Sequence, residues 1–139
     1  MNTLACAPRR SAPFVIALAL IVALLAHPAS AAAPQCYTYS GGAYCQYDGK
    51  VNRAYINAYG QVLLYFDTPM APGVPGSVGI SGVSIGEAAI YPVSENPDFA
   101  KALYATLLSA QARGATVQVQ MFGSNAGYLK MDRVWILEN

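Results

Sequence analysis

Residues 96–114, NPDFAKALYATLLSAQARG, contain the clearest helix signal in the sequence. Asn96 is a favourable N-cap, because its side-chain oxygen can accept a hydrogen bond from an N–H of the first turn. Pro97 suits the first helical position, where its missing N–H is not needed. Asp98 and Arg113 place opposite charges near the two ends of the helix dipole, and Gly114 suits the C-terminal stop. The sequence therefore predicts one helix with defined ends.

This helix has two faces of different character. At about 100° per residue, one face collects residues that we expect to lie on a core: Phe99, Leu103, Thr106, Leu107 and Ala110. The opposite face is poor in charge for a helix facing water, and it carries Lys101, Tyr104, Ala105, Leu108 and Ala112. We expect Tyr104 and Leu108 to form an oligomer face. The alternative is an exposed, alanine-rich face on a monomer.

The N-terminal residues have the layout of a secretory signal peptide. Arg9 and Arg10 precede an uncharged apolar run over residues 14–26, and Ala29-Ser30-Ala31 offers a cleavage site. We predict that residues 1–33 are removed and that residues 34–139 form a single domain, exported to the periplasm or secreted. The alternative is an uncleaved anchor, for which the apolar run is short.

The kinds of function open to the chain are limited by its charged residues, its cysteines and its single histidine. All seven acidic residues and six of the eight basic residues follow the predicted leader, and this near-neutral balance argues against nucleic acid and electrostatic membrane binding. Cys6 and His27 leave with the leader, so Cys36 and Cys45 are expected to form a disulfide. Without histidine, Ser-His-Asp and Cys-His catalytic arrangements are excluded. We expect no enzyme, no metal and no cofactor.

Five strands are predicted around the helix, over residues 50–58, 61–67, 87–93, 115–122 and 128–137. The first two form an antiparallel hairpin, while residues 33–47 form a disulfide loop and the Pro/Gly-rich residues 68–86 another loop. In the fourth strand, Val117, Val119 and Met121 are expected to point inward. In the last strand, Leu129, Met131, Trp135 and Leu137 share a face with Arg133, so Trp135 is predicted to be core and Arg133 structural.

The resulting order of elements is β-β-β-α-β-β. This order predicts a mainly β fold with one helix, arranged as a five-stranded oligonucleotide/oligosaccharide-binding (OB)-like barrel. Closing the sheet would also remove exposed edges, which a small secreted β-domain has to protect. An open meander covered by the helix is the alternative.

The chain resembles the OB-fold B subunits of the subtilase-cytotoxin type, and secreted bacterial proteins built on the same plan. An early disulfide hairpin, a paired GKVNRAYINAYGQVLLYF, a helix ending LLSAQARG, then ATVQVQMF and MDRVWIL carry the resemblance. It covers most of the predicted mature chain as a pattern, and it implies a five-stranded barrel that forms a ring and binds glycans. The Pro/Gly-rich segment and the placement of the disulfide depart from this plan, and no sugar-contacting residue can be carried over.

Tyrosine gives the main indication of function. Four of the ten tyrosines cluster around the predicted disulfide and are the candidate ligand-binding residues: Tyr37, Tyr39, Tyr44 and Tyr47. Tyrosine offers a rigid flat surface with a polar tip, although it also packs in strands with one edge wet. We predict a non-catalytic binding module for a glycan or a protein, which forms a ring as a homo-oligomer. The alternatives are a small periplasmic enzyme, an enzyme inhibitor that uses residues 68–86, or an uncharacterised envelope protein.

Overall fold

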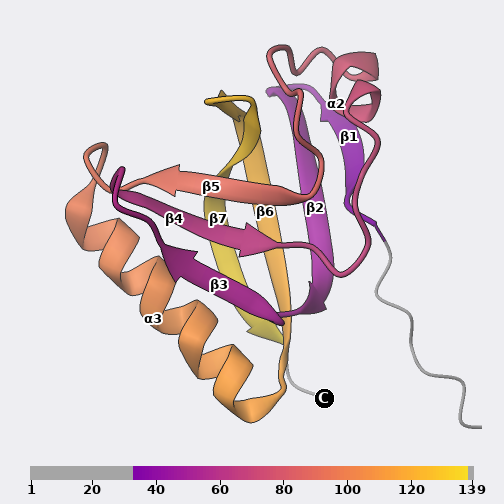
Figure 1. Cartoon of the computed structure of the whole chain (residues 1–139). Helices are drawn as coiled ribbons and strands as arrows, with labels where there is room; N and C mark the ends of the chain where they lie inside the picture. Colours follow the sequence, from indigo (N-terminus) through magenta and orange to yellow (C-terminus); the bar gives the residue numbers. More distant parts are fainter. Residues whose placement is uncertain (1–32, 138–139) are drawn as a thin grey trace, which may run out of the picture. The chain divides into compact units, whose positions relative to one another are not determined.

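The structure, a computed structural model, describes residues 33–137 as a β-rich fold with one long helix (Figure 1). Its elements in chain order are β1 (Gln35–Tyr39), β2 (Gly42–Lys50), β3 (Arg53–Ile56), β4 (Gln61–Tyr65), α2 (Gly73–Ser77), β5 (Ala88–Pro92), α3 (Pro97–Arg113), β6 (Thr116–Asn125) and β7 (Tyr128–Leu137). Except for Ala33, the predicted signal peptide lies outside the described residues. Within those residues, no helix is long and apolar enough to cross a membrane.

Helix α3 begins and ends where the sequence predicts. The side-chain oxygen of Asn96 accepts a hydrogen bond from the backbone N–H of Phe99 over 3.0 Å, and Pro97 is the first helical residue. Gly114 ends the helix with φ 60° and ψ 25°, a left-handed conformation that glycine adopts without a Cβ clash. The predicted inner face is confirmed in its centre, because Leu103 and Leu107 are fully buried.

All seven strands belong to one mixed sheet with the order β1-β2-β6-β7-β5-β4-β3. Neighbouring strands are antiparallel except for β5 and β7, which run parallel. Parallel neighbours need a crossover connection, and here α3 and β6 lie between them in the sequence. The predicted hairpin of residues 50–67 is confirmed as the β3–β4 pair.

The prediction of a closed five-stranded barrel is wrong, because the structure has a seven-stranded open sheet. The two additional strands, β1 and β2, come from the cysteine segment that was expected to be a loop. β2 pairs with the edge of β6 that does not face β7, so β3 and β6 are not neighbours and the five predicted strands do not close into a barrel. The sheet is not a meander either, since β5 and β7 are parallel.

The chain itself forces this sheet to curl. Only Val51 and Asn52 separate β2 from β3, yet these strands lie near opposite ends of the strand order. The C-terminal end of α3 holds this break, because Gln111 donates to the Asn52 carbonyl over 2.9 Å and Lys50 donates to the Gly114 carbonyl over 2.7 Å. Figure 1 shows the result: β3, β4 and β5 cross β2, β6 and β7, and α3 runs along one side.

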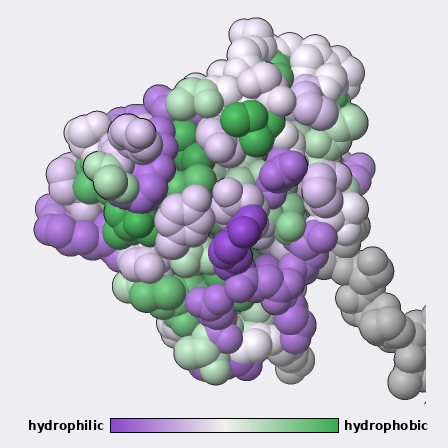
Figure 2. Space-filling model, in the orientation of Figure 1, coloured by the Kyte–Doolittle hydropathy of each residue, from purple (hydrophilic) through white to green (hydrophobic). Residues whose placement is uncertain are grey.

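The hydrophobic core lies inside the curled sheet and under α3. Its buried residues include Tyr47 from β2, Leu64 from β4, Leu107 from α3, Val119 from β6 and Met131 from β7. Among the described residues, no buried side-chain nitrogen or oxygen lacks a hydrogen-bond partner. The outer surface in the same orientation is a mosaic, with hydrophobic patches interrupted by hydrophilic residues (Figure 2).

The predicted disulfide between Cys36 and Cys45 is confirmed, and it joins directly paired residues of β1 and β2. The segment around it is thus a hairpin of two strands. Strand β1 buries little of its own surface, since Gln35 and residues 37–39 are exposed. The disulfide and the pairing with β2 therefore hold β1 in place.

Residues 68–86, expected to be one loop, contain the short helix α2 and are anchored at several points. The backbone N–H of Met70 donates to the Gly86 carbonyl over 2.8 Å, and those of Ser84 and Ile85 donate to the Gly127 carbonyl over 2.8 and 2.9 Å. Gly86 must lack a side chain, because a Cβ there would collide with the backbone of Met70. These contacts hold the segment against the turn between β6 and β7.

Two adjacent leucines of α3 provide a matched test of this packing. Leu107 is fully buried, whereas the side chain of Leu108 is 40% exposed. We expect Leu107→Ala to lower the free energy of unfolding by about 2–5 kcal/mol, because it leaves a cavity in the core. Leu108→Ala should cost less than about 1 kcal/mol. Urea unfolding of residues 34–139 measures both, and equal losses would contradict the placement of α3.

The buried Tyr47 predicts how stability depends on pH. Its hydroxyl donates to the Lys50 carbonyl over 3.0 Å and accepts from the Asp67 N–H over 3.3 Å. Burial raises the pKa of Tyr47 above its usual value. Above pH of about 10 the unfolded chain therefore loses a proton that the folded chain keeps, and stability falls as the pH rises.

We expect Tyr47→Phe to lower the free energy of unfolding by about 1 kcal/mol at pH 7, because the hydrogen bonds of the hydroxyl are lost. Between pH 9 and pH 11 the free energy of unfolding should fall by about 1.4 kcal/mol less in Tyr47→Phe than in the unsubstituted protein. Tyr59→Phe is the control, because Tyr59 is 90% exposed. Urea unfolding at each pH measures the effect, and an unchanged alkaline slope in Tyr47→Phe would rule out this role of Tyr47.

Candidate functional site

The candidate site lies on the outer face of β1, β2, β6 and β7, opposite the core. Strand β6 shows which residues face the core and which face outward, because its side chains alternate between the two faces of the sheet. Val117, Val119 and Met121 are buried, as predicted. Gln118, Gln120 and Phe122 consequently point outward, and they are the centre of the outer face.

A bulge in β7 places Arg133 and Trp135 on this outer face. Gln120 pairs with Arg133, but the next residue, Met121, pairs with Met131, so Asp132 is an extra residue in β7. One extra residue reverses the alternation beyond it. The predicted core position of Trp135 is therefore wrong, and its side chain is 41% exposed.

Three aromatic rings from neighbouring strands form a corner. The rings of Tyr44 and Phe122 are nearly parallel, with an angle of 24° and centroids 5.6 Å apart. The ring of Tyr39 stands across both, at 72° to Tyr44 and 85° to Phe122. Tyr37 extends the group on β1, with its centroid 5.4 Å from that of Tyr44. Gly41 leaves room for this arrangement, because a Cβ there would collide with the Tyr39 ring.

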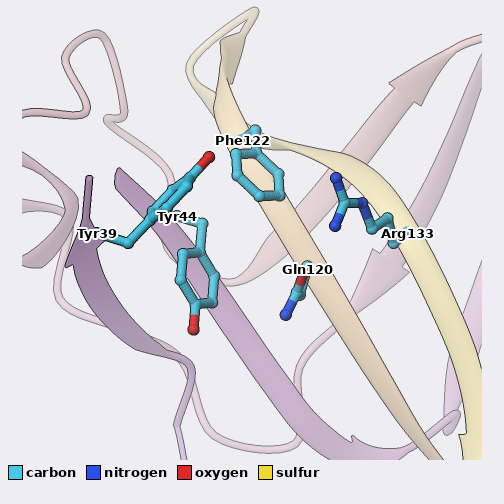
Figure 3. Close-up of a pocket in the computed structure, with 5 residues that line it drawn as sticks. All are labelled: Tyr39, Tyr44, Gln120, Phe122 and Arg133. Atoms are coloured by element: carbon cyan, nitrogen blue, oxygen red, sulfur yellow. The ribbon is translucent and has the colours of Figure 1, made fainter. Parts of the chain in front are cut away.

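This corner lines an open pocket of about 340 Å³, at the lower end of the usual range for small-ligand sites. We call it the aromatic corner, and its residues are Tyr39, Tyr44, Gln120, Phe122 and Arg133. Figure 3 shows these side chains converging from four neighbouring strands. The guanidinium of Arg133 points toward the Phe122 ring, with its Cζ atom 5.4 Å from the ring centroid.

A row of hydrogen-bonded side chains continues from the corner along the sheet. Gln120 donates to the side-chain oxygen of Gln46 over 3.2 Å, and Gln46 donates to Asp48 over 2.8 Å. Gln118 donates to the other Asp48 oxygen, also over 2.8 Å. We call Gln46, Asp48, Gln118 and Gln120 the amide row. These contacts fix the amides in position while leaving each glutamine with unused hydrogen-bonding capacity.

The structure brings three of the four predicted tyrosines together. Tyr37, Tyr39 and Tyr44 lie on the outer face, and Tyr37 and Tyr39 are 45% and 51% exposed. Tyr47 is fully buried, because along β2 it alternates with the outward residues Gln46 and Asp48. Its ring packs 5.0 Å from that of Phe66 in the core. Tyr47 therefore does not belong to the candidate site.

Sequence reasoning missed the contribution of Phe122, Gln120 and Arg133. The alternation in residues 115–122 already indicates that the glutamines point outward, and Phe122 has the same parity as Gln118 and Gln120. Its position beside Tyr44 depends on the pairing of β2 with β6, which local patterns do not reveal. For Arg133, the bulge in β7 leaves no clear sequence signal.

The predicted oligomer face is divided between two environments. Leu108 is exposed, whereas Tyr104 is partly buried and packs against the core. The face that a second copy could contact is thus smaller than the helix pattern predicts, with Leu108 as its main apolar residue.

Other groups in the described part of the chain offer less for binding. On β3 and β4, the Cζ atom of Arg53 lies 3.3 Å from the centroid of the Tyr65 ring and covers one of its faces. Within residues 33–137, no cluster of three or more His, Cys, Asp or Glu residues could hold a metal ion. The aromatic corner is our candidate site, because it combines several rings with polar side chains in one pocket.

No protein-family model, curated protein or solved structure matches the chain. The resemblance to toxin B subunits therefore stays an expectation from sequence, and the function has to be argued from the aromatic corner and the residues around it.

Proposed function

We propose that the chain is an exported, non-catalytic binding module that recognises a glycan through the aromatic corner. The observation that carries this proposal is the combination of near-parallel Tyr44 and Phe122 rings with the adjacent polar groups of Gln120 and Arg133. The rings are accessible from an open pocket on the sheet surface.

The chemistry of this surface suits a sugar. A pyranose ring has a face of C–H groups and a rim of hydroxyls. Aromatic faces carry partial negative charge and attract such C–H groups. The amide of Gln120 and the guanidinium of Arg133 offer donors to hydroxyls at the rim, and the glutamine also offers an acceptor. Because the hydrogen bonds of the amide row already hold Gln120, binding would cost less ordering entropy.

The arrangement of elements also supports an OB-like binding module. If β2 and β3 are taken as one strand interrupted at Val51 and Asn52, and the short helix α2 is counted as part of the connection from β4 to β5, the order after β1 is strand, strand, strand, helix, strand, strand. This is the order expected of an OB-like fold, in which the barrel is partly open and oligosaccharides are among the ligands. In this proposal β1 is an addition that supplies Tyr37 and Tyr39.

The disulfide supports the proposed export, because disulfides persist mainly in oxidising compartments. The anchored backbone of residues 68–86 does not favour the alternative of an inhibitor that presents this segment as a protruding wedge. We therefore prefer the glycan to an inhibited enzyme as the partner.

A glycan array probed with residues 34–139 tests the proposal. We expect retention on a defined set of glycans, and Tyr44→Ala and Phe122→Ala should each weaken binding by about tenfold or more. Tyr59→Ala is the matched control, because Tyr59 is exposed at the turn between β3 and β4.

Three results would count against the proposal. They are an array without any bound glycan, equal loss of binding in Tyr59→Ala, and stoichiometric capture of a protein from envelope extract without any glycan. Far-ultraviolet circular dichroism of each variant checks that a loss of binding does not reflect unfolding.

Assembly into a homo-oligomer is a separate proposal, supported by the exposure of Leu108 on α3. Native mass spectrometry of residues 34–139 should give a multiple of the protomer mass, and Leu108→Glu should shift the protein to the monomer. A monomer at micromolar concentration in the unsubstituted protein would refute this proposal.

A further inference from the structure

We infer that the aromatic corner is the closed end of a longer binding surface, which takes the end of a straight, neutral oligosaccharide of at least three sugar units. Trp135 is the second aromatic contact of this surface. The inference rests on the proposed glycan binding, and it specifies the length, the charge and the orientation of the ligand.

The orientation follows from the ring of Tyr39. This ring stands nearly perpendicular to Phe122 and lines the pocket beside the paired rings. Figure 3 shows the Tyr39 ring beside those of Tyr44 and Phe122, so a sugar stacked on these two rings would meet Tyr39 on one side. A chain can therefore continue only away from Tyr39, which places a chain end in the corner.

The path away from Tyr39 follows the amide row. Opposite residues of neighbouring strands share a face, so Gln46, Gln120 and Arg133 form one line across the sheet. The next outward line holds Asp48, Gln118 and Trp135. A ligand running along β6 would pass amide groups on both lines before it reaches Trp135.

The distance to Trp135 sets the length of the ligand. Trp135 pairs with Gln118, which lies four residues before Phe122 on β6. At roughly 3.3 Å per residue, this separation is about 13 Å. A single pyranose ring cannot contact Phe122 and Trp135 together, so the two aromatic contacts require several linked units.

The charges beside this path favour a neutral ligand. The acidic groups near this path are the carboxylates of Asp48 and Asp132, and the nearby guanidinium of Arg133 already donates from its Nε atom to Asp132 over 3.0 Å. Lys50, at the far end of β2, donates to the Gly114 carbonyl. An acidic sugar would thus meet more negative than uncommitted positive charge, whereas hydroxyls can use the carboxylates as acceptors.

Isothermal titration of residues 34–139 with β-1,4-linked glucose oligomers of one to six units tests the inference. These oligomers are straight and expose flat apolar faces, and the matching oligomers oxidised to carboxylates at C6 provide the acidic series. We expect affinity to rise at least tenfold between one and four units and then to level off. The neutral tetramer should bind at least fivefold more tightly than the acidic tetramer.

Variants assign these effects to residues. Trp135→Ala should reduce the affinity for the tetramer at least fivefold and leave the affinity for a single unit unchanged, while Trp135→Phe should retain most of the tetramer affinity. Trp135 is the single tryptophan of the chain, so its fluorescence should change with the tetramer and not with the monosaccharide. Asp48→Asn should narrow the difference between the neutral and acidic series, and Glu87→Gln, outside this face, should not.

The inference is overturned if one and four units bind equally, if the acidic series binds more tightly, if Trp135→Ala does not weaken tetramer binding, or if none of these oligomers binds. The glycan array separates these failures from failure of the proposed function. Retention of only acidic or branched glycans on the array would reject this inference and keep the glycan-binding proposal, whereas an array without any bound glycan would reject both.

Discussion

The alternation of side chains along β6 is the constraint on which the rest of the structure depends. This strand lies between β2 and β7, and its neighbours must match its register if the apolar residues are to share one side. Burial of Val117 and Val119 aligns Tyr47 of β2 with the core. The same register aligns Gln118 and Gln120 on the outside. The pairing of β6 with its neighbours thus places the core on one face of the sheet and the candidate site on the other.

Two local features place the residues of the candidate site on this register. The bulge at Asp132 lets β7 contribute Met131 to the core and Arg133 to the outer face, which an unbroken alternation could not do. At the other edge, the disulfide between Cys36 and Cys45 holds a strand that has little buried surface of its own. Both features lie close to the aromatic corner, and both help to place its side chains.

Contacts between side chains hold the residues of the candidate site in place. The amide row connects Gln120 to Gln46 and Asp48, and ring contacts fix Tyr39 and Tyr44 against Phe122. A surface built on paired strands keeps its geometry better than one built on loops, so less entropy is lost on binding. In this respect the corner differs from an incidental cluster of exposed tyrosines.

Helix α3, its caps at Asn96 and Gly114, the disulfide and the inward residues of β6 could all be predicted from the sequence, because each depends on contacts or periodicities within a short stretch. Three tyrosines of the candidate site were also predictable from their clustering. The pairing of β2 with β6 could not be predicted from either strand, and it sets β2 instead of β3 beside β6 and places Tyr44 next to Phe122. The tertiary structure also decided the outward position of Trp135, since a bulge is defined by pairing between strands and leaves little trace in either strand alone.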